Sequence, residues 1–193
     1  MYLNLTISTD LCIDTGYTKA DKYDKDAYFC IYFARGCCSE GANCRYYHRV
    51  PQPQDFGEED QMKDCFGRSL HPKYKEDGAG IGAFQGGCTT LKVVDFNLPS
   101  LTASQKDMAK LFYDLFAPWG EIVDVHFNPS KCVGLVKYAH RFSAEFAREA
   151  MMDQTLGNSD EPIMIKWAID NPFDKKNPTV ILDDGEVEPT SVG

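Results

Sequence analysis

Hydrophobic and polar positions follow regular periods mainly in the second half of the chain. Residues 90–96 alternate with the two-residue period of a half-buried strand. Apolar side chains at helical spacing predict a helix over 102–116, which Pro118 and Gly120 end. The same two patterns predict further strands at 121–127, 131–138 and 163–168, and a second helix at 142–152. Strand-helix-strand twice in about eighty residues is the βαββαβ plan of a ferredoxin-like α+β domain.

The third predicted strand carries a more specific signal. Its sequence, Lys-Cys-Val-Gly-Leu-Val-Lys-Tyr at 131–138, resembles the octamer of the RNA recognition motif (RRM) within that βαββαβ plan. Val133 and Leu135 stand where this family usually has base-stacking aromatic residues, and Lys92 replaces an aromatic in the first strand. The resemblance therefore implies an RRM fold that lacks the usual stacking platform.

Strand alternation predicts which side chains lie on the open face of this sheet. They form an apolar centre flanked by lysines: Lys92, Val94, Lys131, Val133, Leu135, Lys137, Met164 and Lys166. The lysines can hold phosphates while apolar groups pack under a base or ribose. Alternatively, the face can be buried against a protein segment, and chemistry alone does not separate the two. Cys132, Tyr138 and Trp167 are expected in the core.

Residues 30–48 have the spacing of a metal site. Cys30, Cys44 and His48 combine with either Cys37 or Cys38 to give three thiolates and one imidazole. This donor set suits tetrahedral Zn²⁺, and four protein ligands leave no open position for a catalytic water. The segment is short and interrupted by glycine, so we expect one structural zinc ion whose binding is coupled to folding.

This pattern resembles the CCCH zinc finger, a family in which the second gap is usually five residues, which implies Cys38 as the ligand. Such fingers commonly bind single-stranded RNA. Unpaired bases stack on aromatic or guanidinium planes, and cations follow the phosphates. The candidate RNA contacts of the finger, with its arginines expected to be exposed, are Tyr32, Arg35, Arg45, Tyr46 and Arg49. For Phe29 and Phe33, a place in the small core of the finger is as well supported as contact with RNA.

Charge narrows the function classes. The net charge of -9, from 20 basic and 29 acidic residues, argues against a generic nucleic-acid binder. The acids concentrate in 51–60 and in 171–193, whereas 17–50 has a surplus of cations. No apolar stretch approaches the length of a membrane span, and eight cysteines are too sparse for a disulfide scaffold. No nucleophile has a recognisable partner, so we expect no enzyme and no small-molecule substrate.

The segment between the two modules mixes aromatic, basic and glycine residues. Phe66, Arg68, Lys73 and Tyr74 are the candidate RNA contacts there. Such a segment either docks on one module and touches nucleic acid, or only packs on the RRM.

The whole arrangement resembles one splicing-factor family, called complexed-with-Cdc-five protein two in yeasts, a component of the NineTeen complex. The resemblance lies in the runs at 16–21, 28–30, 33–36, 64–68, 80–82 and 166–168. It implies a nuclear protein that binds U6 small nuclear RNA and intron RNA and supports the active conformation of the spliceosome's RNA core. Finger, connector and RRM would form one surface, in a body that includes a Torus region. The alternative is a protein-interaction scaffold that contacts RNA only through the finger.

The expected organisation has five parts. An N-terminal segment at 1–27, a remnant of the Torus region, precedes the CCCH finger at 28–50. An acidic linker and connector at 51–87 then lead to the RRM at 88–170 and a flexible acidic tail at 171–193. Only 29 residues precede Cys30, fewer than the family's Torus segment implies, so the start is expected to be truncated, misannotated or reduced.

Overall fold

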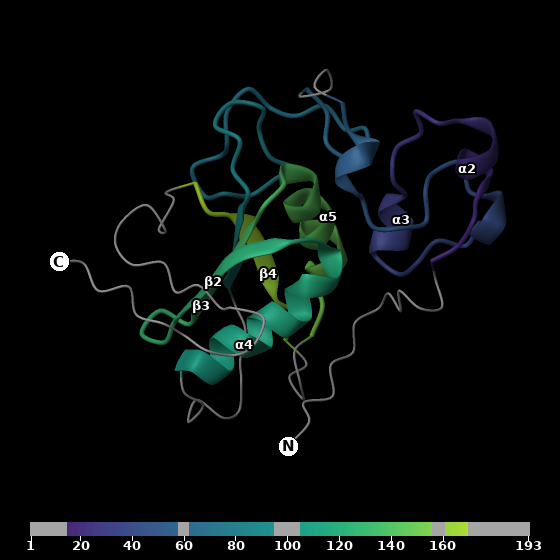
Figure 1. The fold of residues 1–193 in the computed structure, drawn as a ribbon. Helices are drawn as coiled ribbons and strands as arrows, with labels where there is room; N and C mark the ends of the chain where they lie inside the picture. Colours follow the sequence, from purple (N-terminus) through teal and green to yellow (C-terminus); the bar gives the residue numbers. More distant parts are fainter. Residues whose placement is uncertain (1–14, 58–61, 95–104, 156–160, 170–193) are drawn as a thin grey trace.

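A computed structural model describes residues 15–57, 62–94, 105–155 and 161–169 of the 193 (Figure 1). The N-terminal part has short elements: α2 (Lys19–Tyr23), α3 (Ile31–Ala34), η1 (Gly41–Asn43) and η2 (Pro53–Asp55). The C-terminal part has the longer ones: β1 (Thr90–Val94), α4 (Gln105–Phe116), η3 (Ala117–Trp119), β2 (Ile122–Asn128), β3 (Val133–Tyr138), α5 (Arg141–Met151) and β4 (Met164–Trp167). Within these ranges, no helix is both long and apolar enough to cross a membrane.

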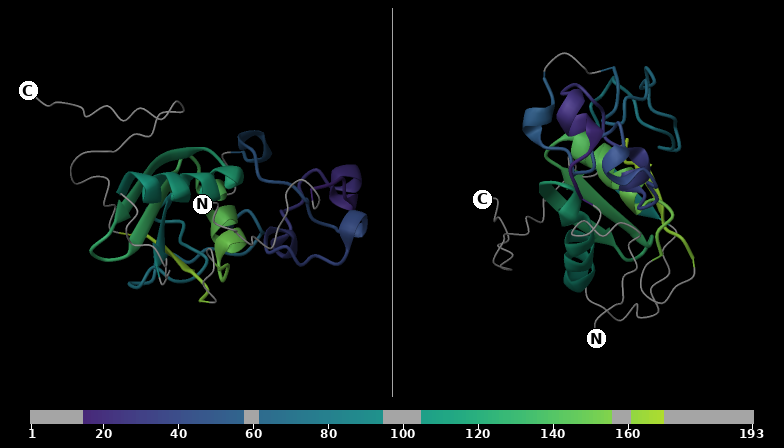
Figure 2. Two further views of the ribbon diagram at one scale, coloured as in Figure 1. Left: turned by 90° about the horizontal axis from the view of Figure 1, so that it is seen from below. Right: turned by 90° about the vertical axis from the view of Figure 1, so that its right-hand side faces the viewer.

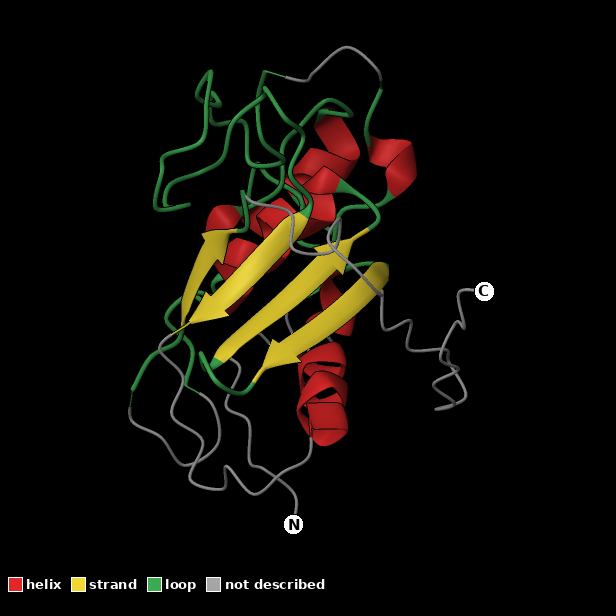
Figure 3. Cartoon of the chain, turned by 90° about the vertical axis from the view of Figure 1, so that its left-hand side faces the viewer, coloured by secondary structure: helices red, strands yellow, loops and turns green. Residues whose placement is uncertain are grey.

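The four strands form one antiparallel sheet in the order β2-β3-β1-β4. Leu91, Val93 and Val136, from the two central strands, are fully buried and form the floor of the core. The helices lie behind the sheet, so its other face is turned away from them (Figure 3). This order is that of the βαββαβ plan, so the predicted α+β fold with an RRM is confirmed.

Helix α4 approaches β3 closely because Gly134 has no side chain. A Cβ atom at this position would lie 2.6 Å from the ring of Phe112, a fully buried residue of α4. The glycine of the RRM-like octamer is therefore needed for α4 to pack against the sheet.

Helix α5 is buried on two sides. One side faces the sheet, and the other meets the finger and the connector (Figures 1 and 2). The ring of Phe146 on this outer side lies 5.6 Å from that of Phe66 and 6.3–6.4 Å from those of Phe33 and Phe29, measured between centroids. The predicted apolar stripe at 142, 146 and 150 thus packs partly against another module, which the sequence did not indicate.

The connector covers the edge strand β4. The N–H of Trp167 donates to the carbonyl of Gly78 at 2.8 Å, and its indole Nε1–H donates to the carbonyl of Gly80 at 3.1 Å. Gly78 has a φ of +71°, and a side chain there would run into the carbonyl oxygen of Trp167. This contact hides backbone groups that an exposed edge would offer to other strands.

The predicted ends of β2, α5 and β4 differ from the structure by one residue, and the largest difference is at the start of β3. Tyr138 and Trp167 are buried as expected, and the Tyr138 hydroxyl donates to the carbonyl of Phe116 at 2.8 Å. The core placement of Cys132 is wrong: this residue is exposed in the turn before β3, with a φ of +48°. The predicted strand therefore begins two residues too early. Residues 95–96 and 102–104 of the predicted first strand and helix lie outside the described residues.

We expect the finger and the RRM to unfold together, because Phe146 belongs to both cores. Phe146→Ala should lower the free energy of unfolding by about 3–5 kcal/mol, the usual range for a buried phenylalanine. Urea unfolding of the metal-loaded protein, followed by tryptophan fluorescence and by release of metal, should give coincident transitions at a lower midpoint. Val123→Ala, at an exposed position of β2, is the matched control and should change little. Two separate transitions in the unmodified protein would contradict the shared core.

Candidate metal centre and nucleic-acid interface

Four side chains of the finger converge. The ligand atoms of Cys30, Cys38, Cys44 and His48 all lie within 4.8 Å of one another, and three of these residues are buried. Cys37, the alternative that spacing left open, is exposed and outside the cluster. Of the two sets that the spacing allows, the structure therefore brings together the one with Cys38.

Backbone pairing explains how ligands eighteen residues apart meet. The N–H of Cys30 donates to the carbonyl of Tyr47 at 3.0 Å, which places the first ligand beside the last. Cys30 then precedes α3, where its Sγ accepts a hydrogen bond from the N–H of Phe33 at 3.4 Å. The ring of Phe33 in turn stacks on the imidazole of His48 at 5.0 Å.

The donor set fits a soft divalent metal ion. Burial raises the pKa of Cys30 to about 12 and raises that of Cys44 as well. Without a nearby cation, clustered buried thiols stay protonated. A bound metal ion instead stabilises the thiolates, which are its ligands. Three sulfurs and one imidazole at this spacing thus form a site that can bind a metal ion.

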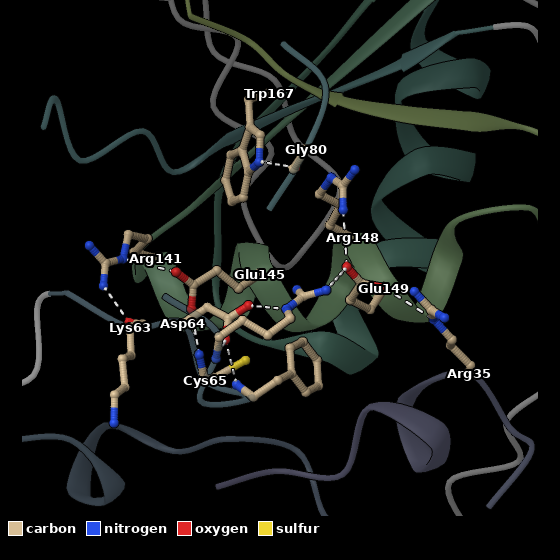
Figure 4. Close-up of polar contacts among 12 residues, drawn as sticks. Arg35, Lys63, Asp64, Cys65, Gly80, Arg141, Glu145, Arg148, Glu149 and Trp167 are labelled. Atoms are coloured by element: carbon tan, nitrogen blue, oxygen red, sulfur yellow. Dashed lines mark hydrogen bonds and ion pairs between the residues drawn. The ribbon is translucent and has the colours of Figure 1, made fainter. Parts of the chain in front are cut away.

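A buried carboxylate on α5 joins the finger to the connector. The carboxylate of Glu149 forms ion pairs with three arginines (Figure 4). They are Arg35 of the finger (Nε–Oε2, 3.1 Å), Arg68 of the connector (Nη1–Oε1, 2.9 Å) and the neighbouring Arg148 (Nη1–Oε1, 3.0 Å). Burial opposes the charge of Glu149, but Arg68, Arg35 and Arg148 outweigh it and hold the pKa of this carboxyl below its usual value. Three segments of the chain therefore meet at one negative charge.

A second buried carboxylate lies one turn earlier on α5. Glu145 accepts the backbone N–H of Cys65 at 2.9 Å, and its Oε1 lies 3.0 Å from Nε of Arg141 (Figure 4). Burial nevertheless raises the pKa of Glu145 to about 7. Asp64 in the connector accepts Nε of Arg68 at 2.6 Å, and burial raises its pKa. These acids serve packing and not the metal cluster.

The finger displays part of its predicted RNA set. Tyr32 and Tyr46 are 60% and 47% exposed, and Arg45 is exposed between the ligands Cys44 and His48. Arg35 is exposed as expected but paired with Glu149.

Arg49 corrects an expectation of the sequence analysis. It was expected to be exposed, but it is half-buried, because both of its Nη atoms donate to Asp55 at 2.6 and 2.7 Å. Its guanidinium also lies over the ring of Tyr47 at 4.5 Å. Arg49 therefore stabilises the finger itself and is not free to bind a phosphate.

The connector residues are mostly engaged within the protein. Phe66 is buried, and its ring packs on Phe146 and under the guanidinium of Arg68. Arg68 also pairs with Asp64 and Glu149. The hydroxyl of Tyr74 accepts the N–H of Cys88 at 3.1 Å. Lys73 is exposed. Docking of the connector on the RRM is therefore observed, and Lys73 is its most accessible candidate.

The sheet candidates fall into rows across the strands. Leu135 pairs with Lys92, which pairs with Lys166 of β4. These lysines, Val133 and Lys137 are half-buried, Lys131 is exposed in the turn before β3, and Leu135 is buried despite its place on this face.

Four further residues lie close to the candidate surfaces and were not predicted from the sequence. Asp124 and His126 of β2 lie opposite Lys137 and Leu135, and the alternation of polar residues at 124, 126 and 128 was the signal that could have found them. Tyr17 and Tyr23 are 69% and 71% exposed, and their position beside Lys19 and Lys22 was the corresponding signal in the finger region.

Comparison with known proteins finds one family model and several splicing factors that match this chain. A model described as the Torus domain matches residues 5–68, which extends past the segment at 1–27 and through the finger. The pre-mRNA-splicing factor cwf2 of Schizosaccharomyces pombe is 39% identical over 82% of this chain and 38% of its own length. CWC2 of Saccharomyces cerevisiae is 33% identical over 83% of this chain and 51% of its own length. The chain is related to the CWC2 splicing factors.

These relatives are longer proteins, of which the chain spans about 38–51%. They are named as splicing factors and not as enzymes, in agreement with the expectation of a protein without catalytic residues. Among solved structures, the RRM domain of S. pombe Puf1 matches 41% of this chain and 95% of its own, at 20% identity and a TM-score of 0.34. The C. elegans NONO-1 homodimer matches 42% of this chain and 29% of its own, at 23% identity and a TM-score of 0.33. The fold assignment rests on the strand order and not on these two matches.

Two neighbouring cysteines allow a matched test of the metal site. Cys38→Ser should abolish stoichiometric Zn²⁺ or Co²⁺ binding and unfold the finger, whereas Cys37→Ser should leave both unchanged. Co²⁺ absorption, with its thiolate charge-transfer band, and metal analysis after dialysis measure the two effects. Equal losses in both variants would show that the cluster of the structure is not the ligand set.

Glu145 predicts a pH dependence of stability. Its pKa of about 7 in the folded protein exceeds the ordinary 4.5, so its stabilising contribution is complete below about pH 4.5 and is lost as pH rises through about 7. Glu145→Gln keeps an oxygen for the Cys65 N–H but carries no charge. The stability of this variant relative to the unmodified protein should therefore rise by about 3 kcal/mol between pH 4.5 and 8. Urea titrations across this range measure the difference, and a flat difference would contradict the buried-charge explanation.

Proposed function

We propose that the chain is an RNA-binding component of the pre-mRNA splicing machinery that acts in the nucleus without catalysing a reaction. The observation that carries this proposal is the exposure of Tyr32, Arg45 and Tyr46 on a finger built around four candidate metal ligands. Exposed aromatic rings on a small, fixed frame are suited to stack unpaired bases, and Arg45, next to Tyr46 in the chain, is suited to a phosphate. The relation to splicing factors supplies the biological setting.

We assign the metal as one Zn²⁺ ion held by Cys30, Cys38, Cys44 and His48. Zinc accepts three thiolates and one imidazole in tetrahedral geometry, and this closed shell supplies structure and no reactive position. The role of the ion is to fix the backbone between the ligands, on which Arg45 and Tyr46 stand.

The specific RNA partners in this proposal are U6 small nuclear RNA and the intron, and the protein partners are subunits of the NineTeen complex. Glu149 and Phe146 of α5 hold the finger against the RRM, which supports binding of one RNA by two modules in a fixed relative position. Such a surface would hold RNA in the shape that the catalytic core needs. Phosphate contacts would make its affinity salt-dependent.

The remaining predicted contacts divide into two groups. Lys73, Lys131 and the half-buried Lys92, Lys137 and Lys166, with Val133 and Leu135 between them, would extend the surface across the connector and sheet. Arg35, Arg49, Arg68, Phe66 and Tyr74 are held by internal partners, so we assign them to positioning that surface.

A protein-binding role of the sheet is the second candidate. Leu135 is buried at the centre of the open face, and aromatic residues are absent from the RRM's usual stacking positions at 92, 133 and 135. In this case the finger alone would hold RNA.

Substitutions on the finger test the proposal. Tyr32→Ala and Tyr46→Ala should each weaken binding of a U6 RNA fragment about 5- to 150-fold, the value of one stacked base. Arg45→Glu should weaken binding and reduce its salt dependence. Lys110→Glu, on the exposed side of α4, is the matched charge control and should bind normally.

Fluorescence anisotropy at two salt concentrations gives these affinities, and mass spectrometry of crosslinked peptides locates the contacts. Unchanged affinity in all three finger variants, with their zinc content intact, would overturn the proposal. Crosslinks confined to the finger would favour a protein-binding sheet.

A further inference from the structure

The open face of the sheet has a polarity that suits an apolar and acidic peptide. On the β1 and β4 side, Lys92 pairs across the strands with Lys166, and Val94 pairs with Met164, which is 42% exposed. Within the described residues, neither lysine has a hydrogen bond or ion pair to another side chain. The face therefore presents two uncompensated positive charges beside apolar side chains.

The β2 side of the same face differs. Asp124 lies opposite Lys137. Burial raises the pKa of Asp124 to about 6, although the N–H of Val125 and the charge of Lys137 partly oppose this rise. One acid faces one lysine here, so this side offers an acidic ligand no net attraction. Positive potential is left on the side of β1 and β4, where Lys92 and Lys166 lie.

The chain itself carries a segment of matching chemistry. Residues 179–188 read Thr-Val-Ile-Leu-Asp-Asp-Gly-Glu-Val-Glu, a β-prone apolar run followed by four carboxylates and no cation. Apolar residues facing Val94 and Met164, with carboxylates facing Lys92 and Lys166, would complement the surface in both hydrophobicity and charge.

The chain between β4 and the acidic segment is long enough for the segment to reach the open face of the sheet. β4 is the edge strand, and the described part ends at Ile169, two residues after it. The ten residues from 170 to 179 can span up to about 33 Å when extended. Three strand spacings across the sheet amount to about 14 Å. The acidic segment can thus reach the face without strain, at the high effective concentration of a tethered ligand.

We propose that residues 179–188 dock on the β1–β4 side of the open sheet face, with their carboxylates against Lys92 and Lys166. This would make the face an intramolecular peptide-binding surface, and RNA would reach these lysines only by displacing the segment. The proposal does not depend on RNA binding by the finger.

Zero-length crosslinking of the full, zinc-loaded chain without RNA tests the proposal. A carbodiimide should join Lys92 and Lys166 to the carboxylates at 183–188 in the monomer, about tenfold more than it joins Lys110. High salt should reduce these crosslinks. Asp183→Asn, Asp184→Asn, Glu186→Gln and Glu188→Gln combined should shift the backbone amide resonances of Lys92, Met164 and Lys166, whereas the control Asp174→Asn should not.

Several outcomes would overturn the proposal. Crosslinks spread evenly over Lys92, Lys110 and Lys166, or amide resonances unchanged in the neutralised variant, would show that the tail does not dock. Crosslinks between isotopically distinct chains would identify a second copy as the occupant. Protection of the lysines only when RNA is added would assign the face to RNA. Because finger variants are absent from this experiment, its failure is distinct from failure of the proposed function.

Discussion

The carboxylate of Glu149 is the constraint around which the modules are arranged. A buried charge is tolerated only when partners compensate it, and removing one partner of such a pair commonly costs about 3–5 kcal/mol. Here the partners come from the finger (Arg35), the connector (Arg68) and the next turn of the same helix (Arg148). The position of each module is therefore tied to the same atom group. The Glu149 side chain is only 2% exposed, and its removal from water strengthens the attraction between the charges.

Local patterns predicted the elements of the RRM well, because strand alternation and helical periodicity depend on burial within one module. The metal cluster was also visible, since ligands at finger spacing are close along the chain. What the patterns missed were contacts between modules. Arg49 was expected in solvent because nothing in its neighbourhood along the chain shows that Asp55 folds back onto it. Phe66 likewise reads as a surface aromatic until Phe146 of α5 is placed against it.

Cys132 shows a different limit of sequence reasoning. The alternation of residues 131–138 is regular, but β2 ends one residue later and the turn after it is one residue longer than the pattern implies, so the strand begins at Val133. Turn geometry is set by the positions of both flanking strands and has little signal in hydrophobicity. Leu135 is predicted on the correct face, yet it is buried there, because burial depends on neighbours across the sheet and not on alternation alone.

The two-sided burial of α5 also determines what would happen if the modules were separated. The outer side of α5 is covered by the finger and the connector. This side carries Glu145, Phe146 and Glu149, all of which are buried. If the finger were removed, these side chains would become exposed to water. The finger, transplanted alone, would lose the covering of Phe29 and Phe33. Neither module would therefore keep its buried surface covered if it were separated from the other.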